Sequence, residues 1–243
     1  MEDCLKTQLK SEVQNSKLPV FDEFVVEGTW ANSQCLLSDG TTTIRVIAGN
    51  PTVDGNPLVD GPTPTSLINL GVGGKVGIKP KSQMTAYIEQ NIVGTLEDFR
   101  YAVNLKVLGI SRRASALPLS GLHLETFFLY DWVTDLYAGL AGSKSTLTEL
   151  RVYYYANEYF VLDNLVQFEN LEKFYFTDFV LPFTIEDYVS ACREYGRTSS
   201  TNTIKFYGKG ISFNGNVLSD SNIAADVTWT STTITCNGVT INA

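Results

Sequence analysis

The sequence predicts an α+β protein: a β-rich amino-terminal domain with a leading helix, then a stack of short repeats closed by a β-meander. Three observations support this order. They are a helical apolar stripe at the amino end, a hydrophobic phrase that recurs through the second half, and two Asn-Gly pairs near the carboxyl end. The composition, with 44% apolar and 18% charged residues, is typical of an ordered chain.

Residues 1–17 are predicted to form a docking helix. Leu5, Leu9 and Val13 are spaced four apart, which gives a narrow apolar stripe, and Pro19 ends it. An isolated helix of this length is marginal in water, so the stripe should pack against something. Two partners remain open, the chain's own domain and another protein, and the second would make these three residues an assembly contact.

Residues 18–82 are predicted to form a small antiparallel β-domain. This region is rich in Val, Ile, Thr and Gly, and segments such as Gly49-Asn50-Pro51 read as turns between strands. A glycine-rich stretch, Gly71 to Gly77, resembles a phosphate-binding loop, but Val76 stands where that loop needs Ser or Thr. We therefore expect a turn or bulge there, with no cofactor.

Residues 83–200 contain a repeated phrase, Leu-x-x-Φ-x-Φ, in which Φ is apolar. Its four occurrences begin 19, 26 and 21 residues apart, at Leu105, Leu124, Leu150 and Leu171. Self-similarity at such intervals marks stacked units that share one core. Each phrase should point its apolar residues inward from a short strand, with a helical return between strands. This alternation predicts an irregular leucine-rich-repeat-like solenoid.

One return segment has a clear helix signal. Thr184 and Asp187 form a capping-box variant, Ile185 opens an apolar face, and Gly196 supplies the stop. After it, residues 201–243 are predicted to form a carboxy-terminal β cap. Its hairpins are marked by Asn-Gly at residues 214–215 and 237–238, a pair that favours type I′ turns.

The repeat register predicts a binding surface on the outward side of the strands. The fifth positions of successive phrases are Gly109, Phe128, Tyr154 and Tyr175, and Tyr130 lies just beyond the second of these phrases. Rings on neighbouring strands would form a ladder with a spacing of about 4.8 Å. An outward row of rings usually needs a partner, so Phe128, Tyr130, Tyr154 and Tyr175 are the predicted binding residues. The alternative is that the β-domain or another subunit covers them.

Catalytic and metal-binding signals are weak. The single histidine, His123, has no accompanying nucleophile motif. Asp131 and Asp135 are the acidic pair that a carbohydrate-active hydrolase would require. The four cysteines are scattered, do not have zinc-ligand spacing, and are expected to be reduced thiols. We therefore expect a non-enzymatic protein without a metal or cofactor.

Charge and hydropathy exclude further classes. A net charge of -8 disfavours nucleic-acid binding, which depends on Lys and Arg neutralising phosphates. The amino terminus lacks the basic start and apolar stretch of a secretory signal. No apolar run approaches the roughly 20 residues that cross a bilayer, so we expect a soluble chain without membrane insertion.

Several segments resemble proteins of crAss-like bacteriophages of Bacteroidetes and of their hosts. The amino-terminal segment, Asp3-Cys4-Leu5 through Lys10 with Leu18-Pro19, is similar to that of virion structural proteins of these phages. Three further features resemble their leucine-rich-repeat proteins: the central phrases, Glu186-Asp187-Tyr188-Val189 with Gly196-Arg197, and Phe213-Asn214-Gly215. The resemblance implies a head-fibre, decoration or tail-fibre protein, assembled in the host cytoplasm.

The resemblance also implies partners. The amino-terminal segment would dock on other virion proteins, the repeats would contact a host surface protein or glycan, and the chain would form a homo-oligomer. Two alternatives stay open: a bacterial leucine-rich-repeat surface or secreted binding protein, and the carbohydrate-active hydrolase.

Overall fold

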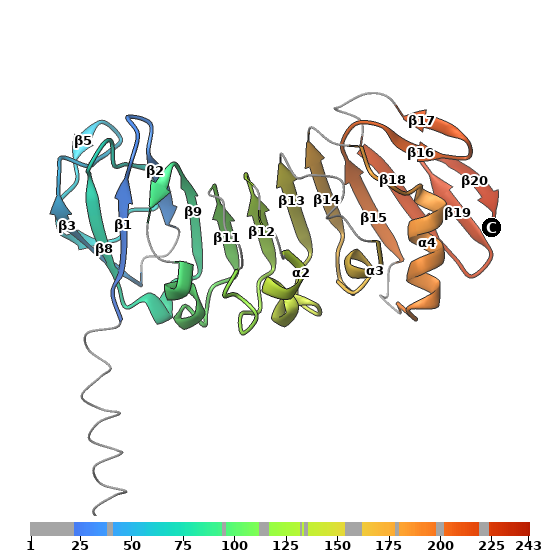
Figure 1. Cartoon of the computed structure of the whole chain (residues 1–243), viewed down its shortest axis with the longest axis horizontal. Helices are drawn as coiled ribbons and strands as arrows, with labels where there is room; N and C mark the ends of the chain where they lie inside the picture. The colour runs from blue at the N-terminus through green and yellow to red at the C-terminus, as the bar shows by residue number, and fades with distance from the viewer. Residues whose placement is uncertain are drawn as a thin grey trace, which may run out of the picture.

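The computed structural model describes residues 22–37, 41–93, 96–111, 117–131, 133, 136–153, 162–177, 180–197, 202–218 and 224–243. The predicted docking residues Leu5, Leu9 and Val13 lie outside these ranges. The molecule is an elongated row of strands with few helices (Figure 1).

The amino-terminal end contains a five-stranded antiparallel sheet in the order β10-β1-β8-β3-β6. Its strands are β1 (Phe24–Gly28), β3 (Thr43–Ala48), β6 (Gly61–Pro62), β8 (Lys75–Lys79) and β10 (Ile92–Val93). Phe24 and Val26 alternate inward, as expected for a strand with one buried face. The predicted turn near Gly73 is present, and Gly73 has the positive φ of 71° that this turn requires.

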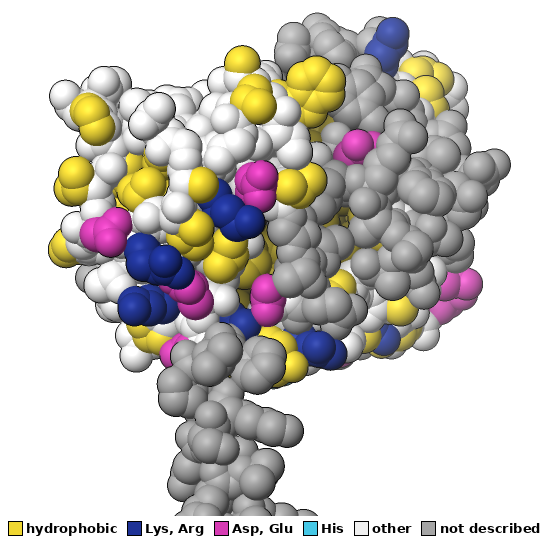
Figure 2. Space-filling model, turned by 60° about the vertical axis from the view of Figure 1, so that its left-hand side comes forward, with side chains coloured by type: hydrophobic (Ala, Val, Ile, Leu, Met, Phe, Trp, Pro, Cys, Tyr) yellow, Lys and Arg dark blue, Asp and Glu magenta, His cyan; other side chains and the backbone are white. Residues whose placement is uncertain are grey.

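Charged side chains at this end lie in pairs of opposite sign. Arg45 bonds Glu23 at 2.8 Å and Lys75 bonds Glu27 at 3.0 Å. Figure 2 shows Lys and Arg side chains beside Asp and Glu, with apolar side chains between them. Exposed pairs of this kind contribute little to stability, roughly 0–1 kcal/mol each. The view shows no large patch of one sign on the described surface.

A second sheet runs the length of the molecule and has thirteen strands within the described residues. Its centre is parallel, with β9 (Ala86–Gln90), β11 (Val107–Ile110), β12 (Thr126–Leu129), β13 (Glu149–Tyr153), β14 (Lys173–Thr177) and β15 (Thr203–Tyr207). Antiparallel strands extend the amino-terminal side: β2 (Gln34–Leu37), β7 (Ile68–Asn69), β4 (Thr52–Val53) and β5 (Asn56–Pro57).

The carboxyl end of this sheet is also antiparallel. Its strands are β18 (Ala224–Trp229), β19 (Thr233–Cys236) and β20 (Val239–Asn242), and a separate hairpin pairs β16 (Ile211–Phe213) with β17 (Asn216–Leu218). Both predicted Asn-Gly turns are present, since Asn214 and Asn237 have φ of 50° and 48° and the following glycines are also positive. The predicted hairpins at this end are therefore confirmed.

The helices of the described residues are short. Among them, the α-helices are α2 (Leu136–Gly139), α3 (Leu162–Leu165) and α4 (Ile185–Glu194), and the 3₁₀ turns are η1 (Lys81–Gln83), η2 (Leu96–Tyr101) and η3 (Ala141–Ser143). Helix α4 begins as predicted. Thr184 accepts from the Asp187 N–H at 3.1 Å, and the Asp187 carboxylate accepts from the Thr184 N–H at 2.8 Å. Gly196, with φ of 75°, follows the helix.

The predicted fold class is wrong. The structure is β-rich, with 42% strand and 15% helix, and its strands form large mixed and antiparallel sheets. The prediction of an α+β protein with a leucine-rich-repeat-like solenoid failed for two reasons. In the described residues, the returns between the parallel strands from β9 to β14 contain only one-turn helices or 3₁₀ turns, and the one longer helix, α4, lies between β14 and β15. The strands on either side of the repeats also join the same sheet.

One hydrophobic cluster runs through the described part of the molecule, from Phe24 to Cys236. A buried row crosses six adjacent strands and contains Tyr87, Leu108, Phe127, Leu150, Phe174 and Phe206. Pairing side by side in register lets these residues bury their apolar area without gaps between units. The opposite side of the same strands carries the candidate site.

A buried arginine links the last parallel strands, α4 and the carboxyl end. Arg197 donates to the carbonyl of Glu169 at 2.8 Å, to the carbonyl of Leu171 at 2.6 Å and to the hydroxyl of Tyr188. Its guanidinium also lies 5.8 Å from the centre of the Trp229 ring. These contacts compensate for the loss of hydration of a side chain that is 7% exposed.

Candidate functional site

The outward side of the parallel strands carries a row of planar side chains, Phe128, Arg151, Tyr175 and Tyr207, which we call the ring row. Strand pairing places each member opposite the next. The Arg151 guanidinium lies 4.8 Å from the centre of the Phe128 ring and 4.2 Å from that of Tyr175. The rings of Tyr175 and Tyr207 are stacked, with centres 4.1 Å apart and planes 5° from parallel.

The register of the third repeat differs from the prediction. Leu150 pairs with Phe127, so the residue opposite Phe128 is Arg151 and not Tyr154. The buried phrase of this unit therefore begins three residues earlier, at Leu147. Tyr153, predicted to be core, is only partly buried and stacks on Tyr130. Tyr154 itself lies outside the described residues, as do Tyr155 and Asp135.

Phe128, Tyr130 and Tyr175 lie where the sequence predicts them, half-buried on the outward side. The rings of Tyr130 and Tyr153 are 4.9 Å apart and 14° from parallel, and the Phe128 ring lies edge-on to Tyr130 at 6.5 Å. Tyr130 therefore connects Phe128 of the ring row to Tyr153 at the end of β13.

Charges within the ring row are paired. Arg151 Nε donates to Glu149 Oε1 at 2.6 Å, and Lys173 Nζ lies 3.4 Å from Glu149 Oε2. Desolvation, a hydrogen bond with Tyr207 and the Glu149 carboxylate raise the pKa of Tyr175 to about 12. Desolvation likewise raises the pKa of Tyr130. The phenols stay protonated at neutral pH, so this surface offers planar groups and hydroxyls.

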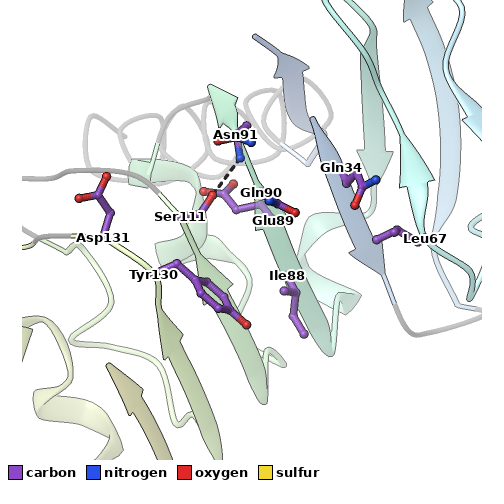
Figure 3. Close-up of a pocket in the computed structure, with 9 residues that line it drawn as sticks. All are labelled: Gln34, Leu67, Ile88, Glu89, Gln90, Asn91, Ser111, Tyr130 and Asp131. Atoms are coloured by element: carbon purple, nitrogen blue, oxygen red, sulfur yellow. Dashed lines mark hydrogen bonds between the residues drawn. The ribbon is translucent and has the colours of Figure 1, made fainter. Parts of the chain in front are cut away.

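A cavity of about 450 Å³ lies beside Tyr130 on the same side of the sheet. It is lined by Gln34, Leu67, Ile88, Glu89, Gln90, Asn91, Ser111, Tyr130 and Asp131. Figure 3 shows Gln34 and Leu67 on one side of the hollow and Tyr130 and Asp131 on the other. Its volume falls within the range of roughly 300–1,000 Å³ that is typical of small-molecule sites.

Two of the catalytic candidates, His123 and Asp131, lie in the described residues. His123 is exposed, and its Nδ1 bonds the carbonyl of Gly142 at 2.8 Å, a structural contact. Asp131 lines the cavity, but its predicted partner Asp135 lies outside the described residues. In the described ranges no group of three or more His, Cys, Asp or Glu side chains is placed to hold a metal ion. Cys35, Cys192 and Cys236 are buried free thiols.

Sequence reasoning missed two members of the ring row, Arg151 and Tyr207, and the cavity. A signal for Arg151 was present, because Leu147-x-x-Leu150-x-Val152 also fits the repeated phrase. The cavity had no such signal, since Gln34 of β2 and Leu67, which precedes β7, reach it only through tertiary pairing of these strands.

The described residues thus form a β-rich protein whose long sheet presents a row of stacked rings next to a polar cavity. Comparison of the chain with protein-family models, with curated protein sequences and with solved structures finds no match in any of the three. None of the helices in the described ranges has the length and hydropathy needed to span a membrane.

Proposed function

We propose that this chain is a non-enzymatic binding protein that presents the outward side of its parallel strands to a protein or a glycan. The ring row carries the proposal. Planar groups held side by side on a sheet bury large areas against a partner, and rings with polar tips suit both protein contacts and the faces of sugar rings. The pairing of Arg151 with Glu149 leaves no isolated charge in the row that would favour an anionic partner.

The ring row is tested with Phe128→Ala and Tyr175→Ala, compared with Tyr195→Ala. Tyr195 is an exposed ring at the end of α4, outside the ring row, and controls for general loss of aromatic surface. Labelled protein is applied to intact cells of a panel of Bacteroidetes strains and to soluble polysaccharides. The two ring-row variants should bind at least about tenfold more weakly than wild type, and the control should not. If Phe128→Ala and Tyr175→Ala bind as tightly as wild type and the Tyr195→Ala control, the ring row is not the binding surface.

We also propose, from the resemblance of the amino-terminal segment, that the chain is a virion component such as a head fibre, decoration protein or tail-fibre part. Mass spectrometry of purified phage particles tests whether the chain is a virion component. In a homo-oligomer several ring rows would act together, so weak individual contacts would give firm attachment. A chain found only in bacterial surface or secreted fractions would favour the bacterial alternative.

Docking through residues 1–17 is a separate part of the proposal. Deleting them should leave the strands folded, judged by circular dichroism, while abolishing incorporation into particles. Leu5, Leu9 and Val13 changed together to Ser should have the same effect if the apolar stripe makes the contact. Normal incorporation of either variant would refute docking by this segment without affecting the ring row.

A further inference from the structure

The cavity lies where β11 is followed by a small residue, Ser111. Within β11, Gly109 pairs with Ile88 of β9 and Phe128 of β12. Ile88 packs over Gly109, because a Cβ placed there would lie 2.8 Å from Ile88 Cγ2. The small side chain of Ser111 therefore leaves a trough between Ile88 and Tyr130, which line the cavity with it.

We propose that this cavity binds one neutral sugar unit of a glycan whose neighbouring units lie along the ring row. The inference rests on the proposed function and specifies its ligand class. Three properties of the cavity support a neutral sugar: an aromatic wall, polar groups that both donate and accept hydrogen bonds, and the sign of the charge.

The aromatic wall is Tyr130. One face of its ring stacks on Tyr153, which belongs to β13. Because β11 lies on the other side of β12, the opposite face of the Tyr130 ring is turned toward the cavity that it lines. A ring face held in place from behind is a stacking platform for the C–H face of a sugar, and Leu67 and Ile88 add apolar surface opposite.

Polar groups surround this platform. Gln34 Nε2 donates to Asn69 Oδ1 at 2.7 Å, which fixes the amide orientation, and Gln34 pairs in register with Gln90. The Ser111 hydroxyl accepts from the Asn91 N–H at 2.9 Å, so its own hydrogen is available to donate. Amides and a hydroxyl both donate and accept, as the hydroxyl groups of a sugar require.

The charge of the cavity favours a neutral ligand. Among the described residues, its lining contains no Lys, Arg or His, and of its two acidic residues Glu89 is buried with its carboxylate bonded to the Tyr87 hydroxyl, so Asp131 supplies the negative charge. A carboxylate sugar would be repelled, whereas a hydroxyl can donate to the Asp131 carboxylate in a charge-assisted hydrogen bond. This disfavours uronic and sialic acids as occupants of the cavity.

The test uses the full-length protein, methyl glycosides of neutral hexoses and of N-acetylhexosamines, and methyl glucuronide as the anionic probe. Binding is followed by saturation-transfer NMR and by calorimetric titration. Ser111→Tyr fills the trough and Gln90→Ala removes an exposed polar group without changing the core. Each should weaken binding of a neutral glycoside by roughly tenfold or more. Tyr195→Ala, an exposed ring at the end of α4 and outside both the cavity and the ring row, is the control and should stay within about twofold.

The outcomes separate this inference from the proposed function. If no neutral glycoside binds but polysaccharide or cell binding still depends on Tyr175, the sugar cavity is overturned and the binding face stands. A glycoside that binds Ser111→Tyr and wild type equally, or a glucuronide that binds more tightly than the neutral sugars, also overturns it. If neither small sugars nor larger partners bind, both proposals fail. Circular dichroism of Ser111→Tyr guards against misfolding, and Gln90→Ala decides the matter if that variant does not fold.

Discussion

Arg151 lies between two aromatic rings on adjacent strands, with its guanidinium 4.2 Å from the centre of Tyr175 and 4.8 Å from that of Phe128. Its Nε also bonds the Glu149 carboxylate at 2.6 Å, so the planar group is fixed from one edge and from both faces. This contact makes the ring row a connected unit.

The first prediction concerns this unit. A double-mutant cycle with Phe128→Ala and Arg151→Ala should give a coupling energy of about 0.5–1 kcal/mol in urea denaturation, the size of a partly exposed cation–π contact. Arg151→Lys should not restore it, because an ammonium lacks the planar surface that two rings contact. Additive single effects would show that the row is only a set of neighbours.

The second prediction concerns the start of α4. Thr184→Ala removes the side chain that accepts from the Asp187 N–H, and should lower the free energy of unfolding by about 1 kcal/mol. Ser190→Ala is the matched control, because Ser190 is exposed in the middle of the same helix. It should be neutral or slightly stabilising, since alanine has the higher helix propensity. Equal losses in both variants would argue against the cap.

The third prediction concerns the buried arginine. Arg197→Ala leaves the carbonyls of Glu169 and Leu171 without the donor that bonds them, and should cost roughly 2–5 kcal/mol of unfolding free energy. Arg45→Ala, which breaks an exposed pair with Glu23, should cost less than about 1 kcal/mol. Chemical denaturation of the two variants side by side measures the contrast. A small loss at Arg197 would mean that water replaces its contacts.

The fourth prediction concerns alkaline pH. Burial, with a smaller contribution from Glu89, raises the pKa of the Cys35 thiol from 9.0 to about 12. The unfolded chain therefore releases this proton at lower pH than the folded chain does, and stability falls as the pH rises from 9 toward 12. Between pH 8 and pH 10, wild type should lose roughly 1 kcal/mol more than Cys35→Ala. Parallel losses in the two proteins would mean that other groups dominate the alkaline transition.

The sequence predicts the structure correctly where a helix cap or a turn depends on the chemistry of a few neighbouring residues. The Thr184 cap, the stop at Gly196 and the two Asn-Gly turns depend on side chains or on positive φ within a few residues, and all are present. The first two repeats and the last also bury the apolar residues that the phrase predicts, among them Leu124 and Leu171.

The third repeat shows why the rest was not predictable by pattern alone. Both Leu147 and Leu150 can begin a Leu-x-x-Φ-x-Φ phrase. The prediction starts the phrase at Leu150 because the aromatic residues that follow resemble those of the neighbouring repeat. In the structure the core contains the phrase that starts at Leu147, because Leu147, Leu150 and Val152 are all fully buried. A one-residue shift exchanges the two sides of a strand, and a three-residue shift does the same. The prediction therefore chose the wrong outward residue.

A further parallel strand was missed because its phrase contains a charge. The core positions of this phrase are Met84, just before β9, and Tyr87 and Glu89 within it, and an acidic residue does not fit an apolar pattern. The Tyr87 hydroxyl donates to the Glu89 carboxylate at 2.8 Å, so the buried oxygen has a partner. The fold class failed through a similar non-local effect, since sequence gave no sign that strands before and after the repeats would join one sheet.

That continuous sheet fixes the pitch of the ring row. Because each planar side chain of the row belongs to a different strand, their spacing is set by the hydrogen-bonded strands at about 4.8 Å per strand. This spacing cannot change when a ligand binds. Such a surface loses little conformational entropy on complex formation. If the proposed binding occurs here, we expect the surface to favour stiff, extended ligands whose units recur at a matching interval over compact or coiled ones.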